Sequence, residues 1–169
     1  AFVSSEFPAR SVCSPDSITI GISQSGETKD TIDAVLEAKI NGSKIASFCN
    51  VIGSTLSRIT GNGVYLHAGA EFAVASTKVF TNMVATGLLF AIYISDRPSK
   101  ENLDVIAELR KLPNTIQGAL MEDDGTIQEA AELIFSSEPP IFIGRGGLSS
   151  ALAREGALKM MEISYIPCL

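Results

Sequence analysis

The chain has 169 residues, of which 46% are hydrophobic and 19% are charged, so it has enough apolar material for a folded core and is not a disordered segment. Its 13 basic and 19 acidic residues give a net charge of −6. The longest cluster of basic residues is the pair Arg110-Lys111, which excludes a basic surface for nucleic acid or an anionic membrane.

Short uncharged strands alternate with helices in the first half of the chain. The pattern predicts strands at 17–22, 44–51 and 63–68, and helices at 28–40 and 76–95. The most apolar run lies in the second of these helices and contains several polar residues. It is too short and too polar for a membrane span, so we interpret it as a buried helix. This alternation predicts an α/β fold, a three-layer α/β/α sandwich around a parallel sheet.

A helical region follows, and then the strand–turn–helix pattern returns. Helices are expected at 100–112, 114–121 and 125–136, with Pro113 ending the first of them. The stretch "PPIFIGRGG" then predicts a strand and a glycine-rich turn before a helix at 149–163. We therefore expect a first domain in residues 1–136 and the beginning of a second, truncated one in residues 137–169. A sheet cut at that point would expose an unpaired edge, so the chain is expected to be incomplete in itself.

The loop "GISQSGETKD" carries several hydroxyl and amide groups directly after the first strand. Ser23, Gln24, Ser25 and Thr28 offer donors, and Gly26 lets the backbone bend close to a ligand. A helix start beside them adds free N–H groups and the positive end of its dipole. This combination predicts a phosphate site that uses no lysine or arginine. The alternative interpretation is a hydroxyl-capped helix start without a ligand.

Two further patterns lie at helices. In "EGALKMMEISY", Glu155, Lys159 and Glu162 are spaced to share one helix face. Such a pattern is usually a solvated salt-bridge stripe, but the apolar neighbours here are also typical of mutually tuned proton-transfer groups, and both interpretations stay open. The segment "EFAVASTKVF" alone is typical of an ordinary helix cap at Ser76 and Thr77.

The three cysteines are far apart and match no zinc or disulfide pattern. We therefore expect no metal site, and a reducing compartment, the cytoplasm. His67, the single histidine, is interpreted as structural.

Three motifs, "SQSGETKDT", "EFAVASTKVFT" and "GRGGLSSALAREGALKMMEISYI", resemble the sugar-isomerase domains of the glucosamine-6-phosphate synthase family, over about residues 5–166. The resemblance implies that a sugar phosphate is bound, without a metal or organic cofactor. It implies phosphate-binding roles for Ser23, Gln24, Ser25 and Thr28, and a sugar-lining role for Val74, Ala75 and Ser76. It further implies that Glu162 moves a proton between C1 and C2, that Lys159 acts at a sugar hydroxyl, and that Glu155 supports both.

The family's activity is the conversion of fructose 6-phosphate to glucosamine 6-phosphate with glutamine-derived ammonia, in an enzyme that commonly forms a homodimer. The family's glutaminase domain and first sheet strand have no counterpart in these residues, so this chain alone is not expected to turn over substrate. Two alternatives stay open: a phosphosugar-sensing regulatory domain, and a related sugar-phosphate deaminase or deglycase.

Overall fold

The structure, a computed structural model, describes residues 3–10, 13–95, 99–122, 125–136 and 139–168. It divides into two compact units, one formed by Ala1–Phe72 with Ser76–Asp96 and the other by Ala73–Ala75 with Arg97–Leu169. Each unit is described by itself. The predicted domain division into residues 1–136 and 137–169 stays a prediction.

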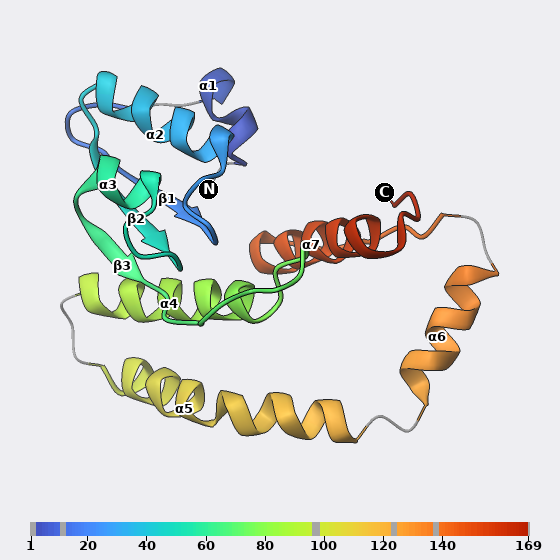
Figure 1. The fold of residues 1–169 in the computed structure, drawn as a ribbon. Helices are drawn as coiled ribbons and strands as arrows, with labels where there is room; N and C mark the ends of the chain where they lie inside the picture. Colours follow the sequence, from blue (N-terminus) through green and yellow to red (C-terminus); the bar gives the residue numbers. More distant parts are fainter. Residues whose placement is uncertain (1–2, 11–12, 96–98, 123–124, 137–138, 169) are drawn as a thin grey trace. The chain divides into compact units, whose positions relative to one another are not determined.

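The first unit is built on a parallel sheet of three strands, as the sequence predicted (Figure 1). The strands lie in the order β1 (Ile18–Ser23), β2 (Lys44–Cys49) and β3 (Gly63–Tyr65). The β1 residues pair in register with β2 from Ile18 opposite Lys44 to Ser23 opposite Cys49. Because all strands are parallel, their carboxyl ends and the loops that follow lie at one edge of the sheet.

One face of the sheet is covered by α2 (Lys29–Ile40) and by the short helix α3 (Thr55–Thr60). Val35, Cys49 and Leu56 are fully buried together in the cluster between these helices and the sheet. The β-branched and apolar residues of α2 recur at the spacing that places them on one helical stripe, which explains why this face and no other is buried. A 3-10 turn (Ser4–Glu6) and α1 (Phe7–Arg10) precede β1, and the 3-10 turn packs against α2.

The opposite face is covered by α4 (Lys78–Ile94). Phe48, Leu66 and Val79 form its buried cluster, and the Phe48 ring meets the Phe90 ring edge-on at 5.3 Å between centroids. Neighbouring residues of β2 thus point to opposite faces, as the pleat of a strand requires. Helices on both sides of the sheet confirm the predicted three-layer α/β/α fold for this unit.

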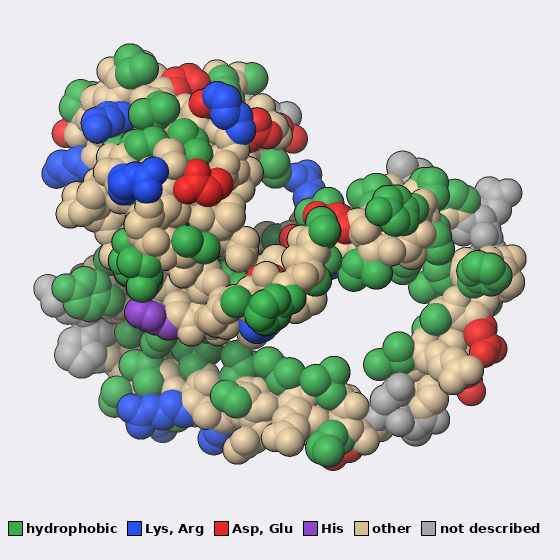
Figure 2. All heavy atoms as spheres, viewed as in Figure 1, with side chains coloured by type: hydrophobic (Ala, Val, Ile, Leu, Met, Phe, Trp, Pro, Cys, Tyr) green, Lys and Arg blue, Asp and Glu red, His purple; other side chains and the backbone are tan. Residues whose placement is uncertain are grey.

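The second unit contains α5 (Lys100–Met121), α6 (Thr126–Phe135) and α7 (Gly147–Ser164). Among its described helical residues, Ala157 is the one hydrophobic side chain that is buried. Hydrophobic side chains lie open along α5 (Figure 2), among them Leu103, Leu120 and Met121. Within the described residues, no helix combines the length and the apolar character that crossing a bilayer requires.

Several predicted elements differ from the structure. The helix break at Pro113 was wrong, because α5 continues through it. The proline removes one N–H donor and its ring crowds the carbonyl four residues earlier, and the helix continues in spite of both. The strand expected in "PPIFIGRGG" was also wrong, because residues 139–145 form no strand there. A strand needs a hydrogen-bonding neighbour, and the sheet in the described residues consists of β1, β2 and β3 alone.

Candidate functional site

The loop after β1 is folded around one buried hydroxyl. Ser23, the last residue of β1, is 5% exposed. Its Oγ accepts the N–H of Gly26 at 3.0 Å and lies 3.1 Å from the hydroxyl oxygen of Thr28. Gly26 has a φ of +67°, a left-handed conformation that glycine adopts without strain. The predicted phosphate-binding residues are therefore held in one tight turn at the carboxyl edge of the sheet. We refer to residues 23–28 as the Ser23 turn.

The hydroxyl groups of this turn do not cap α2. Thr28 occupies the cap position, but its side chain makes no capping hydrogen bond and instead faces Ser23. Ser25 Oγ accepts the N–H of Glu27 at 3.1 Å. In the alternative interpretation of a hydroxyl-capped helix start, the expected side-chain cap is therefore absent at the cap residue, Thr28. The first N–H groups of α2 keep the partial positive charge of a helix start, which suits an anion.

Asn50 joins the three loops at this edge, and sequence reasoning missed it. Its N–H donates to the carbonyl of Gln24 at 3.2 Å. Its side-chain oxygen accepts the N–H of Ala68 at 2.9 Å, and its side-chain nitrogen donates to the carbonyl of Gly69 at 2.7 Å. One residue after β2 thus fixes the loops after β1 and β3. A polar residue directly after a buried strand was the signal that could have found it.

A hollow lies among these loops, with a volume of about 540 Å³. Its lining comes from all three strand ends and includes Gln24, Asn50, His67 and Glu71. His67 has a φ of +53°, which is uncommon for a residue other than glycine. The hollow has room for a small polar molecule beside the Ser23 turn.

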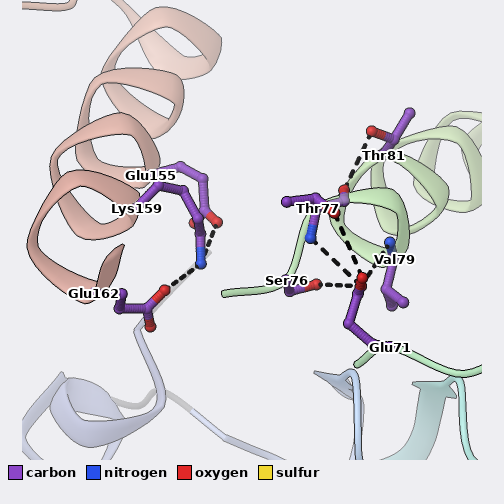
Figure 3. A network of polar contacts seen from close by, with 8 residues as sticks. All are labelled: Glu71, Ser76, Thr77, Val79, Thr81, Glu155, Lys159 and Glu162. Atoms are coloured by element: carbon purple, nitrogen blue, oxygen red, sulfur yellow. Dashed lines mark hydrogen bonds and ion pairs between the residues drawn. The ribbon is translucent and has the colours of Figure 1, made fainter. Parts of the chain in front are cut away.

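Glu71 holds the start of α4 (Figure 3). Its carboxylate accepts the N–H of Val79 at 3.3 Å and the N–H of Thr77 at 3.4 Å, and the hydroxyls of Ser76 and Thr77 donate to it, each at 3.4 Å. The sequence expected Ser76 and Thr77 to cap this helix. The Thr77 side chain makes no capping bond, so the cap is supplied by Glu71 from six residues upstream.

The predicted sugar-lining residues have different surroundings. Val74 is 93% exposed, whereas Ala75 is buried, and both belong to the second unit. Ser76 is half-buried and belongs to the first unit, where it donates to Glu71. Their roles at a sugar stay predictions.

The second unit brings Glu155, Lys159 and Glu162 together on α7, as their spacing predicted (Figure 3). Lys159 Nζ lies 3.3 Å from Glu155 Oε1 and 2.6 Å from Glu162 Oε2. The three side chains are 26%, 22% and 28% exposed in chain order, so they are not the fully solvated stripe of the alternative interpretation. Charges that are half removed from water interact more strongly than exposed pairs do.

Lys159 is the cation of this triad. Burial alone would lower the pKa of Lys159, but the hydrogen bond to Glu162 and the charge of Glu155 outweigh it and raise the pKa above its usual value. An ammonium with a raised pKa stays protonated at neutral pH and acts as a hydrogen-bond donor. The neighbouring carboxylates are the groups of this cluster that can accept a proton.

The described residues contain no group of three histidine, cysteine or acidic side chains arranged to hold a metal ion. The two clusters present hydroxyl groups in the turn after β1 and a lysine between two carboxylates on α7.

Comparison with known proteins supports a single family. The family described as SIS domain matches residues 3–93. A glutamine–fructose-6-phosphate aminotransferase of Caldanaerobacter subterraneus subsp. tengcongensis is 43% identical over 97% of this chain, which corresponds to 28% of that protein. One from Chlorobaculum tepidum is 41% identical over 96% of this chain and 27% of that protein. The chain thus spans less than a third of the curated relatives it matches.

Among solved structures, the C-terminal domain of glucosamine-fructose-6-phosphate aminotransferase from Francisella tularensis matches with a TM-score of 0.87 and 34% identity. The match covers 99% of this chain and 48% of that one. The fold expected from the sequence motifs and the resemblance that they carry are both confirmed.

Proposed function

Because the chain belongs to the SIS-domain family, we propose that it is the phosphosugar-binding part of an enzyme that converts fructose 6-phosphate to glucosamine 6-phosphate with ammonia from glutamine. The observation that carries this proposal is the Ser23 turn, in which hydroxyl groups and the start of α2 meet at the carboxyl edge of a parallel sheet. The names and similarity of the aminotransferase relatives support the choice of reaction.

In the proposed reaction, Ser23, Gln24, Ser25 and Thr28 bind the phosphate through neutral donors. The start of α2 adds its dipole, so the dianion is held without a lysine or arginine in the turn. Val74, Ala75 and Ser76 line the sugar.

Isomerisation moves one proton between neighbouring carbons of the sugar. The Glu162 carboxylate takes the proton from C1 of the ketose-derived intermediate and returns it to C2, while Lys159 donates a hydrogen bond to a sugar hydroxyl. The Glu155 carboxylate forms a second ion pair with the Lys159 ammonium and holds that side chain in position. No metal or organic cofactor enters this scheme. The full-length protein is proposed to act as a cytoplasmic homodimer.

The test is to express the full-length protein and supply fructose 6-phosphate with glutamine. Glucosamine 6-phosphate, followed by mass spectrometry, is the expected product, and fructose without a phosphate is the control substrate. If the protein binds sugar phosphates but forms no product, the alternative function, a phosphosugar-sensing regulatory domain, is supported instead. If the protein releases ammonia from glucosamine 6-phosphate, and forms no glucosamine 6-phosphate from fructose 6-phosphate and glutamine, it is a deaminase.

A further inference from the structure

Two consecutive residues of the Ser23 turn are bonded to the first turn of α3. The N–H of Leu56 donates to the carbonyl of Gly26 at 2.9 Å. The N–H of Thr55 donates to Glu27 Oε1 at 2.7 Å. The turn is thereby tied to a helix start that follows 28 residues later in the chain.

The carboxylate of Glu27 is held as an anion by α3. The Thr55 N–H and hydroxyl bonded to it, together with the charge of Arg58, keep the pKa of Glu27 below its ordinary value. Arg58 is itself fixed, because its guanidinium donates to the carbonyl of Gly53 and, at 3.0 Å, to the Thr55 hydroxyl. The negative charge of Glu27 is therefore matched by an N–H group and a guanidinium.

The underside of the turn rests on α3 as well. A side chain at Gly26 would place its Cβ 2.1 Å from Ser54 Oγ, so the backbone of Gly26 packs directly against the Ser54 side chain. Ser54 is buried, and its Oγ is the one buried side-chain polar atom without a hydrogen-bond partner among the described residues. Leaving a buried hydroxyl unpaired is costly, and it is tolerated here where the turn and α3 meet most closely.

We propose that Glu27 is a positioning residue of the phosphosugar site, which holds the Ser23 turn against α3 without touching the ligand. This inference rests on the proposed function, because it assigns a role in binding the phosphate. A free carboxylate inside a turn that receives a dianion would repel it. Bonded to Thr55, the same carboxylate fixes the spacing of the hydroxyl donors on either side of it.

The experiment compares the full-length protein with the variants Glu27→Ala, Glu27→Gln and Glu37→Ala. Calorimetry measures the affinity for glucosamine 6-phosphate, and hydrogen–deuterium exchange of the ligand-free protein measures protection of the amides of residues 23–28 and 55–56. Glu37→Ala is the matched control, because it removes a carboxylate from α2 away from this contact.

Glu27→Ala is expected to weaken the affinity by roughly tenfold and to speed exchange at these amides. Glu27→Gln keeps an oxygen that can accept from Thr55, so it should restore part of both. Glu37→Ala should change neither. A merely structural residue would lower the thermal midpoint while leaving the affinity at low temperature unchanged, and that result overturns the proposal.

The two possible failures are distinguishable. If the unmodified protein binds no sugar phosphate, the proposed function is wrong and the binding role of Glu27 falls with it. If it binds and Glu27→Ala binds equally well, the function stands and the positioning role is wrong. Unchanged amide exchange in Glu27→Ala overturns the contact with α3 in either case.

Discussion

Lys159 donates a 2.6 Å hydrogen bond to Glu162 from the preceding turn of the same helix. The bond satisfies one oxygen of the carboxylate and leaves the other for a further contact. Because the pKa of Lys159 is raised, its ammonium stays protonated at neutral pH and keeps donating this hydrogen bond.

The first prediction concerns this carboxylate. Glu162→Gln removes the proton acceptor while keeping nearly the same volume, so turnover by the full-length protein should fall about a hundredfold or more. Calorimetric affinity for glucosamine 6-phosphate should stay within a few-fold. Glu108→Gln, which breaks an exposed ion pair with Lys111 on α5, is the matched control and should leave turnover unchanged. Turnover of Glu162→Gln near the unmodified rate would show that Glu162 is not the proton acceptor.

A second prediction concerns the titration of Lys159. Its pKa is raised in the folded protein, so the stability that its ion pairs contribute is fully present below the pKa of an unfolded lysine. That contribution is lost only as pH rises through the higher folded value, above about 10.4. An NMR titration of the lysine side chains should therefore give Lys159 a midpoint above that of an unfolded lysine, with Lys159→Arg used to assign its signal. A midpoint below that of an unfolded lysine would mean that burial outweighs the two carboxylates.

Gly26 cannot be replaced without moving α3. Gly26→Ala would strain a left-handed residue by about 1–2 kcal/mol and would also drive its Cβ against Ser54, 2.1 Å from Oγ. We expect lower thermal stability and weaker binding of glucosamine 6-phosphate. Adding Ser54→Gly removes the opposing side chain and should restore part of both properties. Full recovery is not expected, since the backbone strain remains. A variant that gains nothing from the second change would show that the contact with Ser54 is unimportant.

Ser54 offers a stabilising substitution. Its hydroxyl is buried without a partner, so Ser54→Ala removes an unsatisfied group without leaving a large cavity. The free energy of unfolding should stay the same or rise by about 1 kcal/mol. Denaturant unfolding measures this change, and Ser57→Ala, which loses the bond from its hydroxyl to the Ser54 carbonyl, serves as a contrast that should destabilise. A clear loss of stability in Ser54→Ala would mean that the hydroxyl has a partner in solution.

Asn50 should matter more than a typical loop residue. Asn50→Ala removes the side-chain partner of the N–H of Ala68 and of the exposed carbonyl of Gly69, which should cost about 1 kcal/mol of unfolding free energy. Asn50→Asp keeps the acceptor for Ala68 but loses the donor to Gly69, so it should be intermediate. Thermal melts measure the relative stability of the unmodified protein, Asn50→Asp and Asn50→Ala. Equal stability of Asn50→Asp and Asn50→Ala would show that the bond to Ala68 contributes nothing.

The periodic elements could be predicted from the sequence, because their signal is local. A run of β-branched, uncharged residues indicated β1, and the apolar stripe indicated α2. The helix α3 was missed, because its six residues carry too little of such a stripe. It is nevertheless the helix that supports the Ser23 turn.

The contacts of Asn50, Glu27 and Glu71 could not be read from the sequence for a different reason. Each side chain bonds to a residue in another loop or several positions along the chain. Which residues come close enough depends on the tertiary fold, including the order of the strands in the sheet. The triad of α7 was predictable, since one helical turn fixes its spacing.

Cys49 lies directly beneath the Ser23 turn, where a Cβ on Gly26 would come within 3.4 Å of its sulfur. The thiol is free and 1% exposed, whereas Cys13 and Cys168 are half-buried. A reagent can reach this sulfur only after a local opening of the structure around it, so its rate of alkylation measures how often such an opening occurs. A phosphate-bearing ligand that closes the turn should slow this alkylation and leave the other two thiols unaffected. The Cys49 thiol thus serves as a built-in chemical probe of the Ser23 turn.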